Sequence, residues 1–127
     1  MLFDTDILIW VQRGNTRAAD LIDSADDRYI SIQTFMELLQ NALNKQQHRV
    51  IKKFITDYNF SVLPLTENIG HRALIYVEEY GLSHTMRAGD ALIAATAIEN
   101  NLMLCTSNEK HFRAIKDLEL KIFKPQT

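Results

Sequence analysis

The chain has 127 residues, of which 46% are hydrophobic and 24% charged, with four glycines and two prolines. This length and composition suit one domain spanning residues 1–127 and exclude disordered, collagen-like and low-complexity classes. A formal net charge of −2 argues against a general nucleic-acid coat protein, whose affinity rests on neutralising phosphates. The single cysteine and the acidic opening of the chain favour a cytoplasmic protein with neither a secretion signal nor a membrane span.

Short apolar segments alternate with segments of helical periodicity along the whole chain. Strands are expected at 1–3, 28–32, 60–65, 102–106 and 121–123. Helices are expected at 7–11, 16–25, 35–43, 47–58, 67–80 and 88–100, the last being apolar nearly all round and therefore buried. Pro64 suggests that the third strand ends there or lies at a sheet edge. Strands separated by helices predict an α/β fold with a small central parallel β-sheet flanked by helices.

Acidic residues follow the predicted strands at positions far apart in the sequence. Asp4 comes directly after the first strand, Glu37 lies one helical turn beyond the second, and Asp90 opens the apolar helix. In an open parallel sheet, functional groups gather beyond the carboxyl ends of the strands. Three carboxylates meeting there raise one another's pKa values unless a cation is present. Oxygen-only ligation suits Mg2+ or Mn2+ rather than Zn2+, so these residues are candidate metal ligands.

Each of these acids also has a purely structural interpretation. Asp4 could be a turn residue that bonds its own backbone, and Asp90 could simply favour the positive end of a helix. Thr34 could open a helix, with Glu37 completing a capping box. Taken together these interpretations weaken, because Asp4 and Asp90 lie in some of the most apolar sequence of the chain. A buried carboxylate without a partner there is costly.

Two further features have both a functional and a structural interpretation. His111 begins a helical turn after the fourth strand, where a cap or surface role is expected more often than that of a catalytic base. Four basic residues fall along one side of a predicted helix and form either a solvated face or a face that grips phosphates. They are Lys45, Arg49, Lys52 and Lys53.

Four segments, in this order and spacing, resemble a PIN-domain ribonuclease of the VapC toxin type. They read LFDTDILI at 2–9, SIQTFMELL at 31–39, RAGDALIAATA at 87–97 and LCTSNEKHF at 104–112. The resemblance implies a single PIN-like domain and a metal-dependent endoribonuclease that acts as the toxin of a type II toxin–antitoxin pair. It also implies that Asp4, Glu37 and Asp90 hold Mg2+, for which Mn2+ can substitute.

The sequence departs from the family's pattern at one site position. The family often has a fourth acid where this chain has Asn108, which can still ligate through its carbonyl or hold a metal-bound water as part of the catalytic set. The neighbouring Glu109 is the other candidate for the missing charge. Polar positions that line the family's site or support its ligands match Thr5, Asp6, Ser31 and Thr34.

The resemblance also implies partners. These are an RNA substrate such as a tRNA, a cognate antitoxin whose C-terminal segment fills the acidic groove, and a second copy of the chain in a homodimer. It implies a cytoplasmic protein with no membrane partner.

Two alternative functions stand beside this one. The first is a catalytically silent PIN-like module that binds RNA or protein. The second is a haloacid-dehalogenase-like phosphatase, because Asp4 and Asp6 after the first strand imitate its nucleophile motif and Gly89-Asp90 echoes its metal motif. No second Asp follows Asp90, and the chain is short for that fold.

Overall fold

A computed structural model describes residues 1–126, which are built around one five-stranded sheet. Its strand order is β3-β2-β1-β4-β5, and every neighbouring pair is parallel. The α/β prediction is therefore confirmed, and β3 lies at an edge of the sheet, as Pro64 suggested. The strands are β1 (Leu2–Phe3), β2 (Tyr29–Ser31), β3 (Ser61–Leu63), β4 (Leu104–Thr106) and β5 (Leu120–Ile122).

Seven helices connect and cover the strands in the described part of the chain. They are α1 (Thr5–Gln12), α2 (Thr16–Ser24), α3 (Ile32–Gln40), α4 (Lys45–Asp57), α5 (Glu67–Tyr80), α6 (Ala88–Glu99) and α7 (Glu109–Phe112).

Three helices begin earlier than the apolar periodicity predicted, because polar side chains cap them upstream. The side chain of Asp4 accepts from the backbone N–H of Thr5 and starts α1 there. Ser31 Oγ accepts from the N–H of Gln33 at 3.1 Å, so α3 begins at Ile32 rather than at residue 35. Asn44 likewise caps α4, which begins at residue 45 rather than 47. Helix starts follow the capping side chains rather than the first apolar residue.

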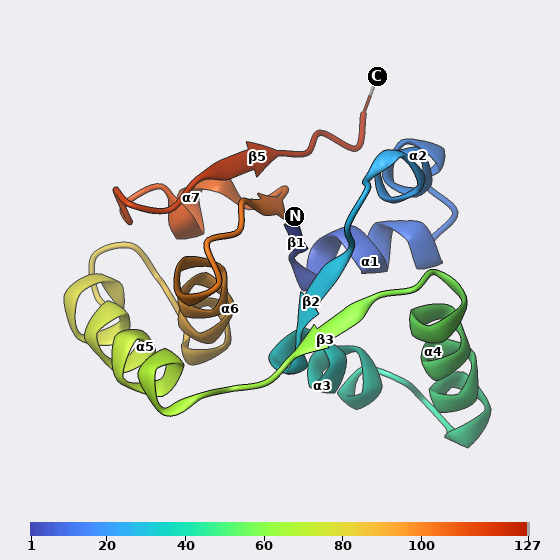
Figure 1. Ribbon diagram of the computed structural model, residues 1–127, viewed down its shortest axis with the longest axis horizontal. Coiled ribbons are helices and arrows are strands. Elements are labelled where there is room, and N and C mark those ends of the chain that lie inside the picture. The colour runs from blue at the N-terminus through green and yellow to red at the C-terminus, as the bar shows by residue number, and fades with distance from the viewer. Residues whose placement is uncertain (127) are drawn as a thin grey trace.

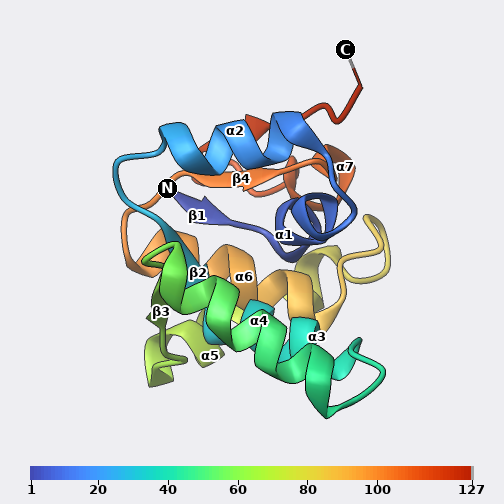
Figure 2. The ribbon, with the colours of Figure 1, turned by 90° about the vertical axis from the view of Figure 1, so that its right-hand side faces the viewer.

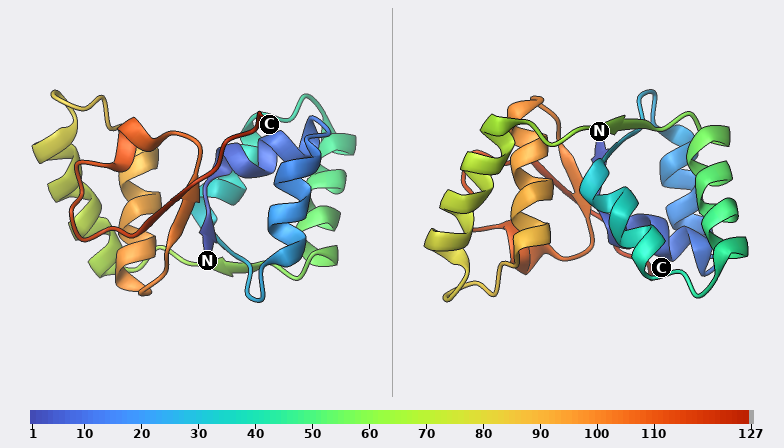
Figure 3. Two further views of the ribbon diagram at one scale, coloured as in Figure 1. Left: turned by 90° about the horizontal axis from the view of Figure 1, so that it is seen from above. Right: turned by 90° about the horizontal axis from the view of Figure 1, so that it is seen from below.

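The sheet separates two hydrophobic clusters. Leu2 and Phe3, both fully buried, point to opposite faces because successive side chains of a strand alternate. Leu2 packs in the cluster that contains residues of α5, α6 and α7, and Phe3 packs in the cluster that contains residues of α1, α2, α3 and α4 (Figures 1 and 3). Burying a side chain of this size contributes about 1.5–3 kcal/mol to the free energy of unfolding. These two neighbouring residues therefore stabilise the packing of helices on both faces of the sheet.

Helix α6 is the most buried helix, as its all-round apolar sequence predicted. Its alanines, which include the fully buried Ala94 and Ala95, let α5 pack closely beside it. Near the start of α5 and at the end of α6, Arg72 Nε donates to Glu99 Oε2 at 2.6 Å. None of the helices within residues 1–126 combines the length and apolar character needed to cross a membrane.

The order of the strands creates a switch point beside β1. The chain proceeds from β1 to β2 on one side of it, while β4 pairs on the other side. Figure 2 shows β1 and β4 running toward the side of the molecule where α1 and α7 lie. Side chains that follow these strands are therefore brought together, which is where ligands bind in open α/β sheets.

Candidate metal centre at the carboxyl ends of the strands

An open pocket of about 460 Å³ lies at the carboxyl ends of β1 and β4. All four residues that the sequence nominated, Asp4, Glu37, Asp90 and Asn108, line this pocket, whereas Glu109 is not among its lining residues and is exposed. The complete lining is Asp4, Thr5, Asp6, Ile9, Glu37, Gln40, Asn41, Arg87, Asp90, Asn108 and His111.

Asp4 is the most buried acid of this pocket, with 5% of its surface exposed. Because β1 pairs with β4, Asp4 lies beside Thr106, whose hydroxyl donates to Asp4 Oδ2 at 2.7 Å. The N–H of Thr5 donates to Asp4 Oδ1 at 2.8 Å. Burial, and next the charge of Asp6, hold the pKa of Asp4 well above its ordinary value, although these two hydrogen bonds lower it. Asp4 does cap a helix, but its ionised form lacks a compensating positive charge.

Glu37 reaches the pocket from α3 and is fixed by two side chains. Thr5 Oγ1 donates to Glu37 Oε1 at 2.5 Å, and Gln33 Nε2 donates to Glu37 Oε2 at 3.2 Å. Thr5 Oγ1 also lies 3.0 Å from Thr34 Oγ1. A hydroxyl has one hydrogen, so Thr5 donates to the carboxylate and accepts from Thr34.

The capping-box interpretation of Glu37 is wrong. Ser31 caps α3, and Thr34 lies fully buried inside the helix. The carboxylate of Glu37 therefore bonds to Thr5 of another helix and not to the end of its own. Propensity and motif spacing placed the start of α3 three residues too late, because the Ser31 side chain already caps the helix by accepting from the N–H of Gln33.

Gly89 allows α6 to approach the carboxylate of Glu37. A Cβ atom at this position would lie 2.6 Å from Glu37 Oε2 and 3.2 Å from Gln33 Nε2. Ordinary van der Waals contact begins near 3.4 Å, so even one methyl group would displace the carboxylate. The glycine is thus required by the close approach of two helices and not by its backbone angles.

Asp90 stands in the first turn of α6 and has two partners. The backbone N–H of Arg87 donates to its Oδ2 at 3.3 Å, which confirms the structural interpretation of a residue at a helix start. His111 Nδ1 lies 3.5 Å from the same oxygen. Burial is the main cause that raises the pKa of Asp90, with Glu37 adding to it, while the Arg87 N–H and His111 lower it.

Two side chains were missed by sequence reasoning: one that lines the pocket and one that bonds to a lining residue. His111 was expected at a cap or on the surface, yet its ring lies against Asp90. The hydroxyl of Thr106 was not singled out, yet it bonds the buried oxygen of Asp4. Their positions in the sequence could have indicated both residues, because Thr106 ends the fourth strand and His111 follows it. Functional groups gather at the carboxyl ends of parallel strands.

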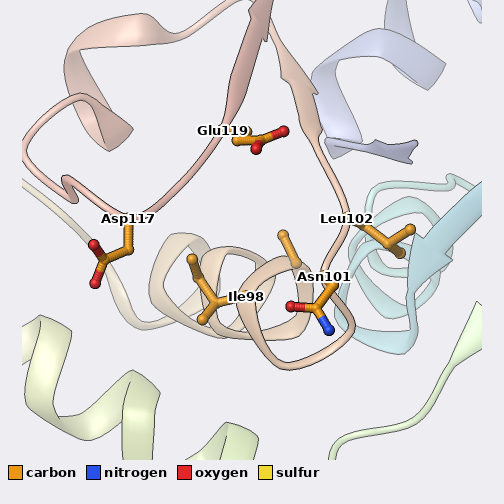
Figure 4. A pocket seen from close by; sticks show the side chains of 6 residues that line it. Ile98, Asn101, Leu102, Asp117 and Glu119 are labelled. Carbon is orange, nitrogen blue, oxygen red and sulfur yellow. The ribbon is translucent and has the colours of Figure 1, made fainter.

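A second hollow, of about 270 Å³, lies elsewhere. It lies between the end of α6 and the segment before β5, and Ile98, Asn101, Leu102, Asp117 and Glu119 are among the residues that line it (Figure 4). These residues precede β4 and β5, so this hollow opens at the amino ends of the strands. None of the nominated residues lines it.

The acidic pocket fits a hard cation by the chemistry of its donors. Asp4, Asp6, Glu37 and Asp90 supply carboxylate oxygens, and within residues 1–126 the only ion pair that involves any of them is His111 with Asp90. Asp6 Oδ1 is buried with no hydrogen-bond partner. In the described part of the chain, however, no three His, Cys, Asp or Glu side chains stand close enough as they are to hold a metal ion. The carboxylates are instead engaged by Thr5, Thr106 and other neutral donors.

Comparison with known proteins gives one consistent result. The PIN domain family matches residues 1–118. The chain is 34% identical over 123 residues to Ribonuclease VapC10 of Mycobacterium tuberculosis, covering 94% of this chain and 90% of that protein. It is 31% identical over 126 residues to Ribonuclease VapC1 of Rickettsia felis, covering 94% and 93%. A toxin–antitoxin complex from Klebsiella pneumoniae contains a chain of similar structure, with a TM-score of 0.78, 28% identity and 98% and 97% coverage.

Proposed function

The chain belongs to the PIN-domain family, and from this membership and its acidic pocket we propose that it is a metal-dependent endoribonuclease, the toxin of a type II toxin–antitoxin pair. The observation that carries the proposal is the gathering of Asp4, Glu37 and Asp90 in one pocket, in a chain whose relatives are named ribonucleases. Membership of this family rules out the haloacid-dehalogenase-like alternative.

We propose that Asp4, Glu37 and Asp90 hold Mg2+, with Mn2+ as a substitute, and that Asn108 completes the catalytic set. When bound, the ion lowers the pKa of a water molecule and neutralises the charge that develops on the phosphate oxygens. Two of the ligands are set in advance by their surroundings: Thr106 fixes the carboxylate of Asp4, and Thr5 fixes that of Glu37. Such preorganisation matters because no reorganisation is then needed during the reaction.

Glu37 is the residue best placed to orient the attacking water. Its two oxygens are held by Thr5 and Gln33, so the carboxylate cannot rotate freely, and each oxygen keeps a further lone pair for the water. His111 lies at the wall of the same pocket, with its Nδ1 3.5 Å from Asp90 Oδ2. Cleavage on this scheme produces a 5′-phosphate and a 3′-hydroxyl.

We further propose three partners. The substrate is a structured RNA such as a tRNA, and the inhibitor is a cognate antitoxin, as the toxin–antitoxin complex of the similar structure suggests. An apolar pocket of about 360 Å³ between α1, α3 and α4 shares Ile9 and Asn41 with the acidic pocket, so one extended segment of an antitoxin can cover both. The third partner is a second copy of the chain, and exposed apolar side chains such as Leu74 and Ile75 of α5 support a homodimer. We propose that the complex acts in the cytoplasm.

The proposal is tested by cleavage of a 5′-labelled tRNA with the purified chain, freed of antitoxin, in Mg2+, in Mn2+ and in EDTA. Cleavage is expected with either metal and not in EDTA. A matched control is Glu37→Gln, purified in the same way, which is nearly isosteric but lacks the charge and should cut at least ~100-fold more slowly. Undiminished cleavage in EDTA would remove the metal from the proposal. RNA binding without cleavage under every condition would favour the catalytically silent module.

A further inference from the structure

Asp6, in the first turn of α1, contacts the residues that lead into α7. Its Oδ2 accepts hydrogen bonds from the backbone N–H of Ser107 at 2.9 Å, from the Ser107 hydroxyl, and from Asn108 Nδ2 at 3.3 Å. These partners are about a hundred residues away in the sequence, and three donors on one oxygen fix both the carboxylate and the start of α7. The contact joins two of the residues that line the acidic pocket.

The other oxygen of Asp6 has no donor. Asp6 Oδ1 is buried and lacks a hydrogen-bond partner, and no Lys, Arg or His within residues 1–126 forms an ion pair with this side chain. A buried carboxylate oxygen that lacks both a donor and a counter-ion is destabilising. Within residues 1–126, no ion pair therefore neutralises the negative charge of Asp6, which lies at the wall of the pocket.

The contact with Asp6 also sets the orientation of the Asn108 amide. The amide nitrogen must face the carboxylate, because the opposite orientation would place a carbonyl oxygen against a carboxylate oxygen. The carbonyl oxygen of Asn108 is then directed away from Asp6, and Asn108 is one of the residues that line the pocket. An oxygen, and not an N–H donor, is what a hard cation or its bound water needs from this residue.

We propose that Asp6 is a positioning residue that supplies the fourth negative charge of the pocket and turns the Asn108 carbonyl toward the bound ion. The two residues act as one anionic unit, with the charge on α1 and the ligand oxygen at the start of α7. This inference rests on the proposed function, since it assigns a role toward the same cation. It replaces Glu109 as the source of the missing charge, because that side chain is exposed and does not line the pocket.

A charge exchange tests the pair: Asp6→Asn, Asn108→Asp and the double variant, with Glu109→Gln as the control for a nearby acid outside the pocket. Mn2+ affinity is measured by titration calorimetry, and melting temperature is measured in EDTA. Asp6→Asn removes the charge, while its amide oxygen can still accept from Ser107 and Asn108, so its Mn2+ affinity should fall at least tenfold through loss of the charge. Asn108→Asp sets two carboxylates in contact and should lower the melting temperature in EDTA. The double variant restores an amide facing a carboxylate, and both quantities should return to within about threefold and about 2 °C of the parent.

Two results would overturn the inference. One is an Asp6→Asn variant that binds Mn2+ as the parent does, and the other is a double variant no better than Asp6→Asn alone. Failure of the parent chain to bind Mn2+ counts instead against the proposed function. In that case the melting temperatures of the four chains in EDTA still test the pair, because additive effects would show that the two side chains are not coupled.

Discussion

Substitution of Gly89 by alanine should separate activity from stability. The added Cβ would lie 2.6 Å from Glu37 Oε2, and ordinary contact begins near 3.4 Å, so the carboxylate oxygen must retreat by about 0.8 Å. The atom that moves is the end of a flexible side chain, and the backbone of the two helices can stay in place. A displacement of about 1 Å at a catalytic group can cost ~10²-fold in rate, which corresponds to about 2.7 kcal/mol of transition-state stabilisation.

The stability of this variant should change little because two effects oppose each other. Alanine in place of glycine in a helix stabilises it by up to about 1 kcal/mol. Weakening the hydrogen bond from Gln33 to Glu37 costs roughly 0.5–1.5 kcal/mol. The melting temperature should therefore stay within a few degrees of the parent value, while kcat/KM for RNA falls about a hundredfold.

Gly70→Ala is the matched control. Gly70 lies in α5, and nothing stands within 4 Å of a Cβ built on it. This variant should gain helix stability and cleave RNA at the parent rate, as measured by differential scanning fluorimetry and initial-rate assays. Parental cleavage by Gly89→Ala would refute the requirement for a fixed Glu37 carboxylate. An unfolded Gly89→Ala variant would refute the expectation that the side chain gives way before the backbone.

Three further perturbations test the electrostatics of the site and the RNA surface. The pKa of Asp4 is raised above 3.8 in the folded chain, so ionisation of Asp4 lowers the free energy of unfolding as pH rises through the folded pKa. In EDTA at pH 7, Asp4→Asn should therefore have a higher melting temperature than the parent. The difference between the two melting temperatures should shrink toward pH 4. Thr106→Val removes the hydroxyl that Asp4 accepts from and should cost about 1–3 kcal/mol in urea unfolding. Thr106→Ser keeps the hydroxyl and should cost only about 1 kcal/mol, for the loss of one buried methyl group. Neutralising the four exposed basic residues of α4 should weaken the dependence of RNA affinity on salt concentration and leave Mn2+ binding unchanged. An unaltered salt dependence would show that this helix face is solvated and does not contact RNA phosphates. These residues are Lys45, Arg49, Lys52 and Lys53.

Much of the site followed from local sequence because of a property of parallel sheets. Asp4 follows β1 and Asn108 follows β4, so both side chains were expected beyond the carboxyl ends of the strands once the strands were recognised as parallel. The buried character of α6 was equally local, since almost every side chain from 91 to 98 is apolar. Fold class, edge strand and the acids of the pocket therefore needed only periodicity and residue type.

Tertiary structure decided which atoms meet. The bonds from Thr106 to Asp4 and from Ser107 to Asp6 join residues about a hundred positions apart, and they depend on strand order and register, which no local pattern encodes. The partner of Glu37 illustrates the same limit: spacing favoured a cap at Thr34, whereas packing of α1 against α3 brings the hydroxyl of Thr5 to the carboxylate. Sequence thus determined that acids collect at one edge of the sheet. Packing determined how each one is held, because hydrogen-bond geometry depends on ångström-scale distances between elements that the chain places side by side only on folding.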